Sequence, residues 1–212
     1  MAILVFETGT ERGIVALYEG KKCLYMAGLP FGYHNSRFLL PKIQEGLSLC
    51  GLLVEDLEVI GVGVGPGSYT GIRVGAIAAK SLSWSKKVPL AGICTLQTLL
   101  PPEKVPFLAM IDAKISGAYV QAGGFENDKL VWMGEPAVVP LDQLGPYLEK
   151  AEVIVTPSAQ KLEKSLQKTR FYETAPDPQY MALRAEEALK SGETTVDGTL
   201  KLLYLRKATP GA

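Results

Sequence analysis

The sequence predicts an α/β protein of two lobes, each with the element order βββαβα. Short apolar runs typical of buried strands alternate with amphipathic stretches along the chain. The order of these elements restarts after the proline cluster Pro101, Pro102 and Pro106. A length of 212 residues is enough for two small lobes. We therefore expect an N-terminal lobe over residues 1–100 and a smaller C-terminal lobe over 101–212, with the chain end free to return to the first lobe.

The first half is predicted to hold three strands joined by tight polar turns, a helix, a buried strand and a second helix. The expected ranges are 2–6, 13–18, 22–28, about 35–50, 59–65 and about 70–86. The first helix places one apolar stripe toward a sheet. This stripe comprises Leu39, Leu40, Ile43, Leu47 and Cys50.

The second half repeats the same order and then adds a short strand and an amphipathic helix that Gly192 ends. The expected ranges are 107–113, 117–123, 129–134, 141–150, 153–157, 158–168, 171–174 and 179–192. The repeated order resembles the actin, sugar kinase and heat-shock ATPase superfamily, a ribonuclease H-like architecture in which two lobes face a nucleotide cleft. A shared fold does not by itself define a function.

The composition argues against several classes of function. The 22 basic and 22 acidic residues cancel, whereas chains that bind nucleic acid through phosphate contacts carry a basic excess. The N-terminus predicts a strand rather than a signal peptide, and no apolar run is long enough to span a bilayer. Cys23, Cys50 and Cys94 have neither a disulfide nor a zinc-ligand spacing, so we expect a cytoplasmic protein. His34 is the only histidine, so neither a metal centre nor a Ser-His-Asp hydrolase is expected.

The most informative segment is GPGSYTGIRVG at residues 65–75, which joins a buried strand to a helix. It matches neither the Walker A loop nor the dinucleotide fingerprint. Two readings stay open: its glycines seat the helix closely on the sheet, or the helix start binds an anion. The residues involved are Gly65, Gly67, Ser68, Thr70 and Gly71.

Both helices of the first half carry more apolar surface than one sheet can cover. A helix that is apolar over most of its circumference needs a neighbour on more than one side. Apolar side chains mixed with charge on an outer face suit a contact with another chain, although scattered surface apolar residues are common. The predicted interface comprises Phe38, Lys42, Glu45, Leu49, Arg73, Ile77, Lys80 and Trp84.

The first hairpin turn offers a second kind of candidate. In a nucleotide-cleft fold, Glu7, Thr8 and Thr10 would face phosphates, and Asp112 stands at the matching place in the second lobe. Two acids facing a cleft could hold magnesium for a phosphotransferase or ATPase. However, polar turn residues are common without chemistry, and no basic residue is placed by a motif to neutralise a phosphate.

Together these segments resemble the TsaB (YeaZ) family. The resemblance rests on FETGTERGIVALYE, His34-Asn35-Ser36 with LLPKI, GVGPGSYTGIRVGAIAAKSL, IDAKISGAYV and LYLRK, and it covers nearly the whole chain in order. It implies a subunit that supports TsaD, the enzyme that transfers threonylcarbamoyl to the adenosine beside the tRNA anticodon.

The resemblance also implies how such a subunit works. The chain would be non-catalytic, would bind TsaD through the two helices of the first half, and would join the ATPase TsaE in a larger complex. The same helices can support a homodimer without TsaD. No intrinsic cofactor is expected, and binding of ATP or ADP at the interface with TsaD stays open. Glu7 stands where aspartate is usual, and Asp112-Ala113-Lys114-Ile115 replaces an arginine-rich turn, so both departures weaken the alternative of a stand-alone phosphotransferase or ATPase.

Overall fold

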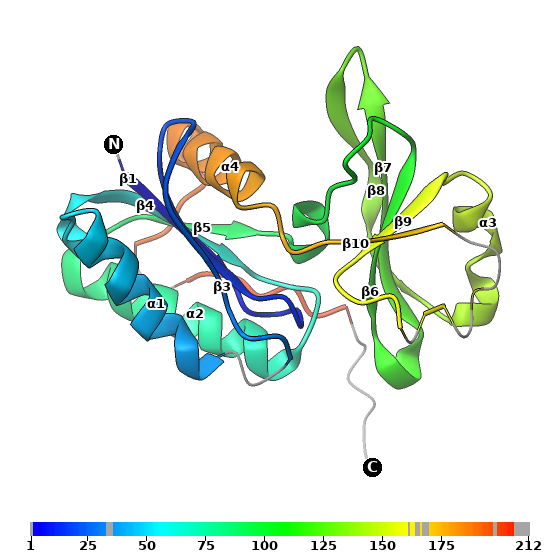
Figure 1. Ribbon diagram of the computed structural model, residues 1–212, viewed down its shortest axis with the longest axis horizontal. Coiled ribbons are helices and arrows are strands. Elements are labelled where there is room, and N and C mark those ends of the chain that lie inside the picture. The colour runs from blue at the N-terminus through cyan, green and yellow to red at the C-terminus, as the bar shows by residue number, and fades with distance from the viewer. Residues whose placement is uncertain are drawn as a thin grey trace.

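The computed structural model describes residues 2–32, 36–160, 162–163, 166, 170–196 and 199–205. Two mixed five-stranded sheets form two lobes side by side, as Figure 1 shows. His34 and Asn35 lie outside the described residues. Within the described residues, no helix combines the length and the apolar character needed to cross a bilayer.

The first sheet has the strand order β3-β2-β1-β4-β5. Its strands are β1 (Ala2–Glu7), β2 (Ile14–Glu19), β3 (Lys22–Gly28), β4 (Leu57–Gly63) and β5 (Leu90–Ile93). The first three strands form an antiparallel meander, whereas β1, β4 and β5 run parallel. This sheet, together with the second sheet described below, confirms the predicted two-lobed α/β fold class.

The alternation of β1 divides the first lobe into two layers of core. Leu4 and Phe6 point into a cluster shared with α1 (Ser36–Leu49) and α2 (Tyr69–Lys86). Ile3 and Val5 point to the other face, where α4 (Pro178–Ser191) packs. Successive strand residues face opposite sides of a sheet, so one strand serves both helical layers.

The second sheet has the order β10-β9-β6-β7-β8. Its strands are β6 (Phe107–Asp112), β7 (Ala118–Glu126), β8 (Lys129–Val139), β9 (Val153–Thr156) and β10 (Phe171–Glu173). Again a three-stranded meander, here β6-β7-β8, adjoins parallel strands. The connection before β9 holds a 3₁₀ turn at Leu141–Gln143 and the short helix α3 (Gly145–Leu148), so the helix predicted over 141–150 is present as two short helical pieces rather than one continuous helix.

Three further expectations need correction or restriction. The sequence places the helix at 179–192 in the second lobe, but α4 lies on the first sheet because Met181, Ala182 and Ala185 cover the face that α1 and α2 leave open. Leu40 is 55% exposed rather than part of the core stripe. The helix expected over 158–168 lies partly outside the described residues, and the described part of this range forms no regular helix.

Two segments tie the lobes together across the cleft between them. Arg12, in the turn after β1, donates from Nε to Pro157 O at 2.6 Å and pairs with Glu173 at 2.6 Å. On another side, Leu200 and Leu203 join the core of the first lobe, while Leu205 packs into the core of the second. Leu203 also donates its N–H to Val64 O at 2.8 Å, which adds the C-terminal segment to the strand end of the first sheet.

Candidate partner interface and interlobe cleft

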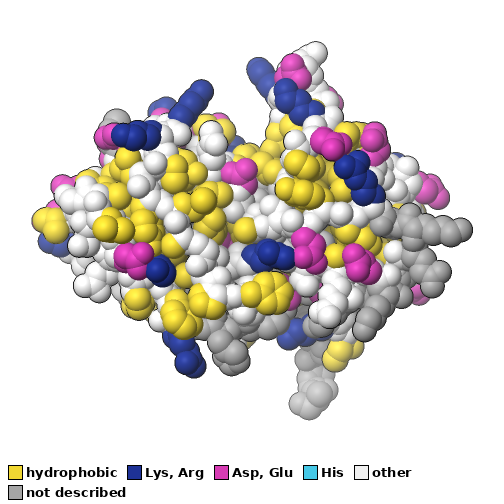
Figure 2. All heavy atoms as spheres, viewed as in Figure 1, with side chains coloured by type: hydrophobic (Ala, Val, Ile, Leu, Met, Phe, Trp, Pro, Cys, Tyr) yellow, Lys and Arg dark blue, Asp and Glu magenta, His cyan; other side chains and the backbone are white. Residues whose placement is uncertain are grey.

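The predicted interface residues lie mainly on the outer side of α1 and α2, two helices that contact each other on one face of the first sheet (Figure 1). Trp84 is 76% exposed and Ile77 is 65% exposed, and Phe38 and Leu49 are also exposed. Figure 2 shows hydrophobic side chains on the surface of the lobe that carries these helices. We call this surface, defined by Phe38, Leu49, Ile77 and Trp84, the α1–α2 face.

Two of the charged side chains on α1, Lys42 and Glu45, form an ion pair with each other. Lys42 Nζ lies 2.6 Å from Glu45 Oε2, and Tyr25 donates its hydroxyl hydrogen to Glu45 Oε1 at 3.0 Å. The hydrogen bond from Lys42 and then that from Tyr25 hold the pKa of Glu45 below its ordinary value. Burial and the neighbouring Glu45 raise the pKa of Tyr25 to about 12. Lys42 and Glu45 therefore lie on this face as a neutral pair.

Two glycines of the GPGSYTGIRVG segment, Gly67 and Gly71, lie against the backbone of the first hairpin turn. A Cβ atom on Gly71 would lie 2.0 Å from Thr8 O, and one on Gly67 would lie 2.3 Å from Gly9 O. Ser68 donates its N–H to Gly9 O at 2.7 Å, and its side chain caps α2 by accepting from Gly71 N at 3.3 Å. Close packing thus accounts for these glycines, and anion binding near Ser68 and Thr70 stays a prediction.

The expected cleft residues are separated by the fold. Glu7 is fully buried, where it accepts from Thr95 Oγ1 at 2.6 Å and from the N–H of Gly9. Burial raises the pKa of this carboxyl. Thr8 and Thr10 are buried as well, and Thr8 donates to Gly71 O at 2.8 Å. Glu7, Thr8 and Thr10 are thus buried within the first lobe, and none of them lines the cavity between the lobes, in contrast to the expectation that they face it.

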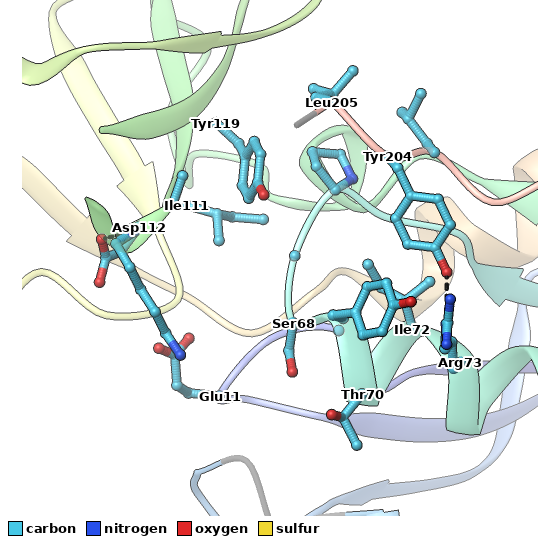
Figure 3. A pocket seen from close by; sticks show the side chains of 17 residues that line it. Glu11, Ser68, Thr70, Ile72, Arg73, Ile111, Asp112, Tyr119, Tyr204 and Leu205 are labelled. Atoms are coloured by element: carbon cyan, nitrogen blue, oxygen red, sulfur yellow. Dashed lines mark hydrogen bonds between the residues drawn. The ribbon is translucent and has the colours of Figure 1, made fainter. Parts of the chain in front are cut away.

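Asp112 does line a cavity of about 700 Å³ between the lobes. Its Oδ1 accepts from the N–H of Lys114 at 2.7 Å, which holds the turn after β6. Glu11 lines the same cavity and replaces Glu7 as the carboxylate of the first lobe. Figure 3 shows Glu11 and Asp112 on one side of the cavity and Arg73 and Tyr204 on the other. Glu11 was not predicted, because the expectation for this turn fell on Glu7 at its start, and the spacing alone does not tell which carboxylate of the turn reaches the cavity.

Arg73 belongs to the rim of this cavity as well as to α2. Its guanidinium carbon lies 3.7 Å from the ring centre of Tyr69, and its Nε donates to the hydroxyl of Tyr204 at 3.1 Å. The two tyrosine rings are 5.4 Å apart. The hydrogen bond to Tyr204 raises the pKa of Arg73. Tyr69 and Tyr204 were not predicted, since their proximity depends on the return of the C-terminal segment.

Within the described ranges, no three His, Cys, Asp or Glu side chains come together as a metal site. The arrangement therefore offers an exposed helical face and a mixed-charge cleft. Each lobe joins a three-stranded meander to parallel strands, and residues of both lobes line the cavity, which defines a two-lobed α/β protein.

Comparison with known proteins narrows this class. A family model described as tRNA N6-adenosine threonylcarbamoyltransferase (TsaD) matches residues 33–138, half of the chain. The chain belongs to this family. The match includes α1 and α2, and thus the whole of the α1–α2 face.

Curated relatives carry the name tRNA threonylcarbamoyladenosine biosynthesis protein TsaB, which confirms the resemblance inferred from the sequence. The protein of Buchnera aphidicola subsp. Schizaphis graminum is 33% identical over 138 residues, covering 63% of this chain and 65% of that protein. The protein of Escherichia coli K12 is 31% identical over 140 residues, covering 64% and 60% respectively. The alignments thus span less than two thirds of these relatives.

A solved structure described as YeaZ from Pseudomonas aeruginosa has the same fold, with a TM-score of 0.81 at 21% identity. The superposition covers 96% of this chain and 99% of that one. At this identity the likeness concerns the fold alone.

Proposed function

We propose that this chain is a TsaB-type subunit that binds a TsaD-type enzyme through the α1–α2 face and supports threonylcarbamoyl transfer to the adenosine beside the tRNA anticodon. The observation that carries the proposal is the exposed aromatic and aliphatic surface of two adjacent helices in a chain of this family. Trp84, Ile77 and Phe38 are side chains of the kind that anchor interfaces when a partner covers them. The names of the curated relatives support the same biosynthetic role.

The proposed role is non-catalytic. Glu7 is buried, bonded to Thr95 and Gly9, and does not line the cavity, so Glu7 and Asp112 do not form the pair of acids that a magnesium site of a phosphotransferase would need. The comparisons do not support the alternative of a stand-alone phosphotransferase. ATP or ADP, in this proposal, binds at the interface of the complex rather than as a cofactor of this chain.

The further partners follow from the same proposal. TsaE joins the pair in a larger complex, the tRNA is the substrate of the complex, and the free subunit forms a homodimer through the α1–α2 face. All of this takes place in the cytoplasm.

Reconstitution tests the proposal directly. Trp84→Glu places a charge on the α1–α2 face, in the last turn of α2, where covering it without a counter-charge is costly. We expect loss of co-purification with TsaD and loss of tRNA modification, with an unchanged melting temperature because Trp84 is exposed. Leu183→Glu is the matched control, since Leu183 is an exposed aliphatic residue on α4, on the opposite face of the first sheet.

Two results would contradict the proposal. If Trp84→Glu supports modification at low subunit concentration as well as the native chain does, the interface is elsewhere. If the purified chain alone turns over ATP, the non-catalytic role is wrong.

A further inference from the structure

The α1–α2 face has a strongly uneven charge although the chain as a whole is neutral. Its two helices hold five basic residues and a single acidic one, Glu45. The basic residues are Arg37, Lys42, Arg73, Lys80 and Lys86. Helix α2 contains no acidic residue at all.

Internal ion pairs cancel only part of this charge. Lys42 pairs with Glu45, and Lys86 pairs with Glu55 from the turn before β4. Among the described residues, no carboxylate pairs with Lys80 or Arg73. Residues 73, 77, 80 and 84 follow at intervals of three and four, so these two cations share one stripe of α2 with Ile77 and Trp84. The stripe is apolar and cationic together.

Arg73 is held in place before any partner arrives. The Tyr69 ring stacks on its guanidinium, and the Tyr204 hydroxyl accepts from Nε. This leaves the two terminal nitrogens, the donors that form paired hydrogen bonds with a carboxylate. A side chain that is already ordered loses less conformational freedom on binding. Tyr69 is 56% and Tyr204 is 44% exposed, so the C-terminal segment adds to the surface beside α2.

We propose that the partner bound by the α1–α2 face presents carboxylates opposite Arg73 and Lys80, and that this charge selects it over a second copy of this chain. The proposal rests on the function proposed above. Two copies meeting through the same face would bring two cationic stripes together, and like charges at an interface favour dissociation. The carboxylates of an acidic partner would attract Arg73 and Lys80, whereas the same two cations of a second copy would repel them.

The test is the sign of the salt dependence. Salt screens charge, and the screening length falls from roughly 10 Å at 0.1 M to roughly 3 Å at 1 M. Affinity for purified TsaD is measured by titration calorimetry, and self-association by sedimentation velocity, each at low and high sodium chloride. We expect TsaD binding to weaken about tenfold or more with salt and self-association to strengthen. TsaD binding that is insensitive to salt, or self-association that weakens with salt, overturns the proposal.

Charge variants locate the effect. Lys80→Glu leaves the Arg73 cluster intact and is expected to weaken TsaD binding at low salt by at least about tenfold while reducing its salt dependence. Tyr204→Phe keeps the ring beside Arg73 but removes the acceptor of the Nε hydrogen bond, and should weaken binding by a few-fold through poorer positioning. Lys129→Glu, an exposed basic residue of the β7–β8 hairpin in the other lobe, is the matched control and should bind as the native chain does.

The outcomes separate this proposal from the one on which it rests. If Trp84→Glu binds TsaD normally, the α1–α2 face is not the interface and both fail. If Trp84→Glu abolishes binding while Lys80→Glu matches Lys129→Glu, the interface stands and the charge selection is wrong.

Discussion

Gly71 lies where the first turn of α2 crosses the backbone of the first hairpin, and replacing it by alanine tests how that helix is seated. A Cβ there would lie 2.0 Å from Thr8 O and 2.9 Å from Thr8 C, both backbone atoms that no rotamer change can move. Overpacking of this kind costs about 3 kcal/mol at the upper end of its usual range. Losing the Thr8 hydroxyl bond to Gly71 O adds about 1 kcal/mol, and the better helix propensity of alanine returns about 1 kcal/mol.

Gly71→Ala should therefore destabilise the protein by about 3 kcal/mol. For a chain of this size, that corresponds to a fall in melting temperature of roughly 6–12 °C, measured by calorimetry or circular dichroism. Gly145→Ala is the matched control, because Gly145 begins α3 with open space around its Cβ position and should be neutral or slightly stabilising. A Gly71→Ala protein that melts at or above the native temperature would refute the steric argument.

Two other substitutions address the buried carboxyl and the link between the lobes. Burial raises the pKa of Glu7 in the folded protein above its ordinary value of 4.5. The protonated carboxyl therefore contributes its full stabilisation of the fold below pH 4.5, and this contribution is lost as the pH rises through the folded-state pKa. Glu7→Gln should remove this part of the decline in melting temperature above pH 4.5, and an unaltered pH profile would show that Glu7 is not responsible. Arg12→Ala removes the contacts to Pro157 and Glu173, and should cost about 1 kcal/mol and widen the interlobe distances seen by small-angle X-ray scattering. An unchanged scattering profile would mean that the other contacts suffice to fix the lobes.

The fold could be predicted because most of its strands and helices follow from the local pattern of apolar and polar residues. The apolar runs at β1 and β4 and the helix ending at Gly192 follow from periodicity and capping alone. The exposed residues of the α1–α2 face were also predictable, because a helical wheel shows when apolar side chains exceed one stripe. Leu40 was misassigned because on the wheel it lies only about 20° beyond Leu47, at the edge of the core stripe, where the wheel alone does not separate buried from exposed positions.

The site could be predicted only in part, because long-range placement decides the rest. Glu7 was expected at a turn, yet β1 extends through it. Its carboxylate accepts a hydrogen bond from Thr95, which lies 88 residues away in the sequence. Arg73 was assigned to the helix surface, and only the return of Tyr204 across 131 residues shows that it is held at the cleft rim. Neither contact leaves a signal in sequence spacing.

The packing of α4 and Leu200 onto the first lobe has a consequence for how the chain is made. All of β6 to β10 is synthesised before these segments, so the first lobe cannot complete its core while the N-terminal half alone has left the ribosome. Proteins of several domains commonly fold from the N-terminus one domain at a time. Here the second lobe is in effect an insertion within the first, and a fragment ending near Leu100 should emerge with one face of its sheet bare and prone to aggregate.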